Sequence, residues 1–192
     1  MTKVYFVRHA QPDYGHADDS TRPLTEEGRK DAGIVLETLR NKAIDVFYCS
    51  PYKRCLDTIR QAAEYYHMDI RTDARLRERK EGVNGNTHAL FQKRWADHSW
   101  HEPGGESIEM VQHRNIEALN EILTAHNGKR IAVGTHGTAL SSIINYYQPE
   151  FGCADFLRIL DWMPYIIELD FEWRRFVSFS ELAHIEKVFI GK

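Results

Sequence analysis

The sequence is poor in cysteine. Its 192 residues contain three, Cys49, Cys55 and Cys153, and no two of them form a CxxC pair. Small secreted domains that depend on disulfides carry more cysteines, usually in even numbers. We therefore interpret the three thiols as buried or inert side chains of a protein in a reducing compartment.

The sequence also lacks a long apolar run and a strong excess of either charge. No stretch approaches the length of a membrane span, and the apolar run 4–7 is too short for a secretory signal and is followed by Arg8. The formal charge is -3 and no half is strongly basic, so a nucleic acid is not an expected partner. We predict a cytoplasmic protein without a membrane or nucleic-acid partner. A few arginines in one pocket would still suit an anionic substrate.

What the sequence does contain is typical of one globular domain. Hydrophobic residues make up 42% and charged residues 28% of the chain, which is the ordinary balance of a soluble protein. A chain of this length can bury a sizeable core. We therefore predict a single domain over residues 1–192.

Short apolar runs alternate with helical periodicities along the chain. The apolar runs predict buried strands at 4–7, 45–49, 69–71 and 131–133. Helical spacing of apolar side chains, with Thr25 and Ser107 as N-caps, predicts helices over 25–41, 52–66, 107–126 and 138–147. This alternation predicts an α/β fold, a three-layer α/β/α domain with a mainly parallel sheet.

Two further segments depart from this alternation. Residues 78–105 are polar and rich in glycine, which predicts a long loop or cap. Residues 165–180 alternate between apolar and polar around Trp173 and Arg174, which predicts a terminal hairpin. The hairpin would offer an edge for pairing two copies into a homodimer, and the sequence leaves that interpretation open.

Polar clusters follow three of the predicted strands. Arg8 and His9 follow the first, residues 50–54 follow the second, and His136 and Gly137 follow the last. Ligands of such sheets bind beyond the carboxyl ends of the strands. The three clusters are therefore expected to meet at one edge of the sheet.

The residue types in these clusters suit phosphoryl transfer. A phosphoryl group keeps its negative charge through the transition state, so catalysis needs fixed cations and a nucleophile in line with the leaving group. Arg8 and Arg54 would supply cations, and His9 and His136 would supply imidazoles. Nearby arginines favour a neutral imidazole, and a backbone carbonyl bonded to one ring nitrogen would fix the tautomer.

The leaving oxygen also needs a proton. Glu78 is the candidate acid, with Glu81 as its nearest competitor, although an exposed ion-pair cluster is the alternative interpretation of both. Gln11 lies near His9 in the chain and is a candidate phosphate donor; its alternative is a loop side chain that faces water. Glu106 is most simply part of a loop before a helix cap.

Six motifs occur in a characteristic order: Val7–Ala10, Leu24–Gly28, Ser50–Thr58, Leu76–Glu78, Gly105–Ser107 and Thr135–Gly137. Together they resemble the histidine phosphatase superfamily, the phosphoglycerate-mutase-like enzymes. The resemblance implies a phosphoglycerate-mutase-like fold that requires no metal and no other cofactor.

The resemblance also implies roles for individual residues. His9 would become phosphorylated, Arg8, Arg54 and His136 would complete the phosphate pocket, and Glu78 would donate the proton. Gln11 and Gly137 are further candidates for phosphate binding. Glycine is more common in this family where Ala10 stands, which leaves the subfamily open. The segment 78–105 would be a cap that sets substrate choice.

The favoured function is therefore a metal-independent phosphatase of a small phosphorylated metabolite. A mutase is the nearest alternative, but mutases of this family tend to be longer. A non-catalytic phosphate-binding module stays open, although every expected pocket residue is present. Sugar phosphates, phosphoglycerates, cobalamin precursors and phosphopeptides all remain candidate substrates.

Two other patterns, a histidine cluster and a group of aromatic residues, are candidates for a metal site and for substrate contacts. His98 and His101, with Glu102 and His88 nearby, would suit a metal on one helical face, but no second ligand pair appears and none is predicted. Three aromatic residues of the cap segment either pack its interior or contact the substrate: Phe91, Trp95 and Trp100.

Overall fold

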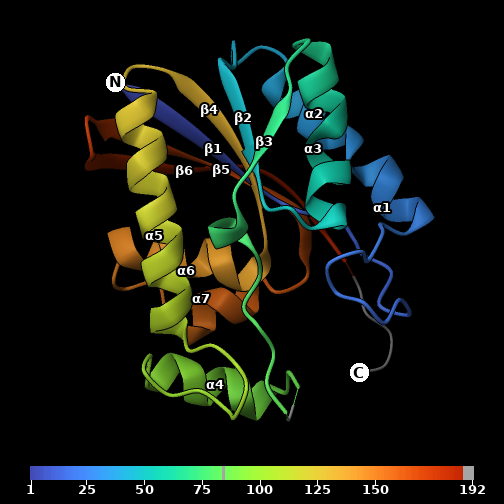
Figure 1. The fold of residues 1–192 in the computed structure, drawn as a ribbon, viewed down its shortest axis with the longest axis vertical. Coiled ribbons are helices and arrows are strands. Elements are labelled where there is room, and N and C mark those ends of the chain that lie inside the picture. The colour runs from blue at the N-terminus through green and yellow to red at the C-terminus, as the bar shows by residue number, and fades with distance from the viewer. Residues whose placement is uncertain (84, 188–192) are drawn as a thin grey trace.

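A six-stranded sheet runs through the centre of the molecule (Figure 1). The computed structural model describes residues 1–83 and 85–187. The strand order is β3-β2-β4-β1-β5-β6. The strands are β1 (Thr2–Arg8), β2 (Val46–Cys49), β3 (Ile70–Thr72), β4 (Arg130–Thr135), β5 (Trp162–Glu172) and β6 (Arg175–Glu186). Strands β3, β2, β4 and β1 are parallel to one another. Strand β5 runs antiparallel to β1, and β6 runs antiparallel to β5.

Strand β1 shows why the sheet is covered on both faces. Val4 and Phe6 point into a core formed with α5 (Ile108–Ala125) and α6 (Gly137–Tyr147). Tyr5 and Val7 point into a second core formed with helices on the other face. Successive side chains of a strand alternate between faces, so an unbroken apolar run requires two apolar layers. The predicted three-layer domain is confirmed, and the two helical layers flank the sheet in Figure 1.

The second layer contains α1 (Glu26–Asp31), α2 (Gly33–Leu39) and α3 (Lys53–Tyr65). Thr25 caps α1 as predicted, because its hydroxyl accepts from the Gly28 amide at 2.9 Å. The single helix predicted over 25–41 is wrong, because the chain forms a tighter turn at Ala32, whose carbonyl accepts from Val35 at 3.1 Å. Two short helices therefore replace one long one.

The cap segment is more regular than predicted. It contains α4 (His88–Ala96), which Thr87 caps through a 3.3 Å hydrogen bond to the Leu90 amide. Figure 1 shows α4 set apart from the sheet, beyond α5 and α7 (Cys153–Arg158). The loop interpretation of this segment is thus corrected, and α7 was not predicted at all. Both helices are short and lie among glycine and proline residues, which weakens any periodicity.

The predicted terminal hairpin is confirmed as β5 and β6, which are longer than the alternating pattern indicated. Strand β6 forms one edge of the sheet. Homodimer pairing along this edge stays a prediction. Among the described residues, no helix combines the length and apolarity needed to cross a membrane.

A buried ion cluster ties the cap segment together. The Glu102 carboxylate accepts from Arg94 at 2.6 Å and from Arg79 at 2.9 Å, and all three side chains are almost fully buried. Arg94 also donates to Asn86 and to the Gly85 carbonyl, both at 2.9 Å. Burial alone would raise the pKa of Glu102, but the Arg94 hydrogen bond and the charges of both arginines outweigh it and lower the pKa to about 2.

We expect Glu102→Gln to lower the free energy of unfolding by about 3 kcal/mol, because the change leaves two buried guanidinium groups without a carboxylate. Urea unfolding at neutral pH measures this. Folding lowers the pKa of Glu102 from 4.5 to about 2, so the ionised carboxylate stabilises the fold fully above pH 4.5. That stabilisation is lost as the pH falls toward 2. The difference in free energy of unfolding between wild type and Glu102→Gln should therefore shrink as the pH falls. Glu117→Gln, at an exposed carboxylate, is the control. A gap that widens in acid would contradict the assignment.

Candidate active site

The three polar clusters meet because their strands are neighbours. Strand β4 lies between β1 and β2, with Arg8 opposite Thr135 and Cys49 opposite Gly134. The residues that follow these strands therefore emerge at one edge of the sheet. A cavity of about 690 Å³ opens there, and its lining includes Arg8, His9, Arg54, Glu78 and Gly137.

His9 is held in one tautomer. Its Nδ1 lies 2.8 Å from the carbonyl oxygen of Ala10. A carbonyl only accepts, so Nδ1 carries the proton and Nε2 of the neutral ring has a free lone pair. Burial, and then the charges of Arg54 and Arg8, hold the pKa of His9 well below 6.5. The neutral form that a nucleophile needs is therefore favoured at physiological pH.

Arg8 is aimed by backbone carbonyls. Its two terminal nitrogens donate to Ile159 at 2.6 Å and to Leu160 at 2.7 Å. These acceptors are uncharged, so they fix the guanidinium without adding a carboxylate to it. A Cβ on Gly137 would lie 3.1 Å from the guanidinium carbon, so glycine permits this close approach. Gly137 thus supports Arg8 and also lines the cavity.

Arg54 is held from the loop before α1. One terminal nitrogen donates to the Asp19 carbonyl at 2.6 Å and lies 3.1 Å from the Asp19 carboxylate. The same carboxylate accepts from Arg22 at 2.7 Å. Asp19 was not predicted as a partner of Arg54, because nothing in its short polar loop indicates a contact with a residue 35 positions away in the chain.

His136 lies behind His9 and is not among the residues that line the cavity. Its ring centroid is 5.3 Å from that of His9, and its Nε2 is 2.8 Å from the Ser50 hydroxyl. The ring of Tyr52 contacts it at 5.1 Å. Burial, followed by the charge of Arg54, holds the pKa of His136 well below 6.5. The structure brings this residue to the site as a neutral, fully buried ring.

Glu78 sits at the N-terminus of α6. Its carboxylate accepts from the amides of Thr138 at 3.1 Å and Ala139 at 3.3 Å, and from the Arg79 amide at 2.7 Å. The first amides of a helix are unpaired within the helix and attract a carboxylate. The half-buried side chain lines the cavity, as does its competitor Glu81.

Arg114 supports the backbone that carries Glu78. It donates to the carbonyls of Arg77 at 2.7 Å and Glu78 at 3.0 Å. The carboxylate of Glu106 accepts from Arg114 at 2.9 Å and from the Lys80 amide at 2.8 Å. Glu106 is therefore more than part of a loop, although it does not line the cavity. Arg114 was missed because it occupies an ordinary position in a long amphipathic helix.

Gln11 lies beside the start of α1. Its amide oxygen accepts from the Thr25 hydroxyl at 3.1 Å, and the side chain is not among the residues that line the cavity. A donor role of its amide nitrogen toward phosphate stays a prediction.

The histidines of the cap do not form a helical ligand pair. Helix α4 ends at Ala96, so His98 and His101 lie beyond it; the first packs against Trp95 and the second donates to the Glu102 carbonyl at 3.1 Å. Within residues 1–83 and 85–187, no group of three histidine, cysteine, aspartate or glutamate side chains is placed to hold a metal ion.

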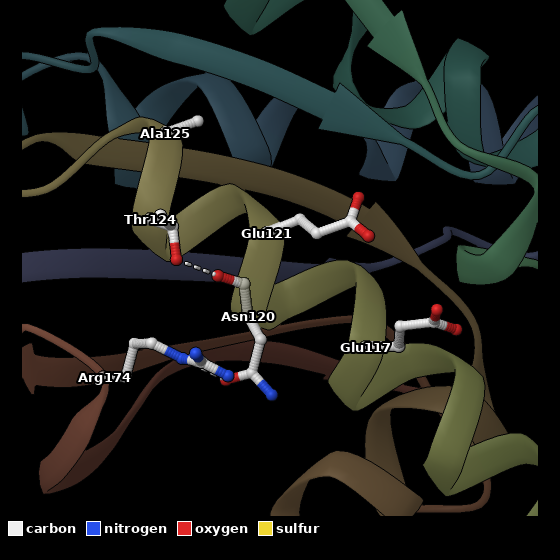
Figure 2. Close-up of a pocket in the computed structure, with 6 residues that line it drawn as sticks. All are labelled: Glu117, Asn120, Glu121, Thr124, Ala125 and Arg174. Carbon is white, nitrogen blue, oxygen red and sulfur yellow. Dashed lines mark hydrogen bonds between the residues drawn. The ribbon is translucent and has the colours of Figure 1, made fainter.

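A second hollow lies against α5, away from these residues (Figure 2). Arg174, at the turn between β5 and β6, bridges to the Asn120 side chain at 3.1 Å. The six described residues of its lining include no histidine or cysteine: Glu117, Asn120, Glu121, Thr124, Ala125 and Arg174. Its chemistry offers no nucleophile beside a fixed cation, so the cavity at His9 is the candidate active site.

Comparisons with known proteins point to one family. The model of the histidine phosphatase superfamily (branch 1) matches residues 4–160. Phosphoserine phosphatase 1 of Hydrogenobacter thermophilus is 28% identical over 150 residues, which are 71% of this chain and 71% of that protein. A Yersinia pestis protein named probable phosphoglycerate mutase GpmB is 28% identical over 160 residues, which are 76% of this chain and 74% of that protein.

Solved structures share the fold. A mutant phosphoserine phosphatase of Entamoeba histolytica in complex with phosphoserine has a TM-score of 0.76 at 18% identity, covering 93% of this chain and 96% of that one. YhfR of Bacillus stearothermophilus has a TM-score of 0.72 at 23% identity, covering 92% of this chain and 95% of that one. At these identities the likeness establishes the fold.

We expect His9 to remain a neutral Nδ1–H imidazole as the pH falls through 6.5, because its pKa in the folded protein lies well below that value. Long-range nitrogen-15 NMR spectra of the ring distinguish the two tautomers and the cation. Ala10→Gly keeps the carbonyl and should leave the tautomer unchanged. An Nε2–H ring, or a cation at pH 6.5, would contradict the geometry.

Proposed function

The chain belongs to the histidine phosphatase superfamily, branch 1, and from this premise we propose that it hydrolyses phosphomonoesters of small metabolites through a phosphohistidine on His9. The observation that carries the proposal is the hydrogen bond from His9 Nδ1 to the Ala10 carbonyl. It leaves Nε2 free in a cavity that Arg8 and Arg54 also line. A neutral nucleophile beside two fixed cations is the arrangement that phosphoryl transfer requires.

The first step forms a bond between His9 Nε2 and phosphorus while the ester P–O bond breaks. Protonated Glu78 gives its proton to the leaving oxygen, so a neutral alcohol departs. Arg8 and Arg54 neutralise the charge that is spread over the phosphoryl oxygens. His136, neutral and in contact with the His9 ring, would support that ring from the side of Ser50.

The second step reverses these roles. Glu78, now ionised, accepts a proton from water while the water oxygen bonds to phosphorus. The N–P bond then breaks, His9 returns to its starting form, and inorganic phosphate is released. The three amide donors that hold the Glu78 carboxylate keep it in place between the two steps.

The relatives include a phosphoserine phosphatase and a protein named as a phosphoglycerate mutase, at the same 28% identity. A mutase would use the same phosphohistidine and return the phosphoryl group to a second hydroxyl. With 3-phosphoglycerate as the substrate, release of inorganic phosphate supports hydrolysis, and conversion to 2-phosphoglycerate supports the mutase.

We expect His9→Ala to lower p-nitrophenyl phosphate hydrolysis by at least about three orders of magnitude in the presence of excess chelator, because the covalent step is lost. Circular dichroism checks that the fold is retained. His113→Ala, at an exposed histidine of α5, is the matched control. Full activity in His9→Ala, or loss of wild-type activity to the chelator, would refute this mechanism.

Glu78→Gln should lower kcat/KM for ethyl phosphate by about 100-fold or more and kcat/KM for p-nitrophenyl phosphate by less than about tenfold. Ethoxide needs a proton to leave, whereas p-nitrophenoxide does not. Steady-state kcat/KM values for both esters measure the contrast, because they report the steps up to release of the alcohol and not the later hydrolysis of the phosphohistidine. If Glu81→Gln shows this contrast and Glu78→Gln does not, Glu81 is the acid.

A further inference from the structure

One wall of the candidate active site is apolar. Leu160, Phe156 and Phe91 all line the cavity, and we call these three residues the apolar wall. They come from α7, from the turn that follows it and from α4, which lies far away in the sequence. The proposed chemistry at His9, Arg8 and Glu78 makes no use of them.

The apolar wall begins next to the phosphate-binding residues. The Leu160 carbonyl accepts from Arg8 at 2.7 Å, so the backbone of this residue is fixed beside the guanidinium. Phe156 lies one turn earlier, in α7, and the Phe91 ring packs edge-to-face on it with centroids 5.1 Å apart. The wall therefore runs outward from Arg8 to the cap.

Phe91 differs from its aromatic neighbours in burial. Phe156 is 3% and Trp95 8% exposed, as core side chains are, and these two rings pack against each other at 5.5 Å. Phe91 is only half-buried, and it lines the cavity. Trp100 contacts the Lys93 ammonium at 3.9 Å and is not in the cavity lining. Of the three cap aromatics, Phe91 is the one that presents ring surface to a ligand.

The cap holds Phe91 in place. Arg94, one helical turn further along α4, lies 5.8 Å from the centre of the Phe91 ring and anchors the helix to Glu102, Asn86 and Gly85. This buried cluster fixes α4 before any ligand binds. A preformed apolar surface binds an apolar group at little cost in side-chain entropy.

We propose that the preferred substrates are phosphomonoesters whose alcohol carries an aromatic or similarly planar apolar group, which packs on Phe91 and the rest of the apolar wall. This substrate class rests on the proposed function. A ring placed there loses its contact with water and gains an edge or face contact with Phe91.

A compact substrate with a second anionic group suits this end of the cavity less well. Arg79 already donates to the Glu102 carboxylate at 2.9 Å and to Asn86 at 3.1 Å. Glu81 and Asp161 add two carboxylates to the lining, against one further ammonium at Lys80. A substrate carboxylate would meet this excess of negative charge, whereas an aromatic ring would not.

The test compares three esters of primary alcohols: benzyl phosphate, ethyl phosphate and the phosphate ester of 3-hydroxypropanoate. None of them has an activated leaving group, so the comparison reports binding of the alcohol. We expect kcat/KM for benzyl phosphate to exceed that for ethyl phosphate by about tenfold or more, mainly through KM. Phe91→Ala should reduce this ratio to within about threefold.

Phe91→Leu keeps an apolar side chain and should retain part of the preference. Trp100→Ala, at a cap aromatic outside the lining, should leave the ratio unchanged. Equal kcat/KM for benzyl and ethyl phosphate, or a preference for the carboxylate ester, would overturn the substrate class while hydrolysis itself still stands.

Binding of two non-hydrolysable probes separates the two proposals. Calorimetry should show benzylphosphonate binding about tenfold more tightly than ethylphosphonate to the wild type, and equally to Phe91→Ala. If no ester is hydrolysed but this difference holds, the hydrolytic function fails and the apolar subsite remains. If the two phosphonates bind equally well to the wild type, the subsite is refuted whatever the enzyme hydrolyses.

Discussion

The parallel pairing of β4 with β1 on one side and β2 on the other is the constraint on which the site depends. Each strand carries its polar residues immediately beyond its carboxyl end, so only a register that aligns these ends brings them together. The observed register does so, with Arg8 opposite Thr135 and Cys49 opposite Gly134. Close packing reinforces it, because a Cβ on Gly134 would lie 2.5 Å from the Cys49 sulfur.

Around this edge, buried arginines are held by backbone carbonyls, either alone or together with a carboxylate. Neutral carbonyls alone hold Arg8, whereas Arg54 is held by both the carbonyl and the carboxylate of Asp19. Arg114 uses carbonyls and Glu106 to hold the backbone at Glu78. A buried guanidinium needs several acceptors to repay its desolvation, and here those acceptors also set its direction. The electrostatics that keep His9 neutral follow from this arrangement.

The cap segment is stabilised differently from the central domain. Its interior is held by one carboxylate, Glu102, shared between Arg79 and Arg94, rather than by a large apolar core. Phe91 packs on the edge of the main core and also lines the cavity. The segment 78–105 is polar in sequence and still offers an apolar side chain to a ligand. Its charged residues Arg79, Arg94 and Glu102 bind one another inside the segment, and Phe91 lines the cavity.

The sequence by itself determined the layers, the mainly parallel sheet and most of the candidate site. Apolar runs ending in Arg8, His9 and His136 are local signals, and the order of strands and helices restricts where their ends lie. It did not determine the break at Ala32, the helix α4 or the partners Asp19 and Arg114, since each depends on contacts between distant parts of the chain. Only the tertiary structure decided that the Gln11 oxygen accepts from Thr25, that Glu78 accepts from the amides of α6 and that Phe91 lines the cavity. Side-chain direction is set by the packing of neighbouring elements, and no periodicity within one segment records it.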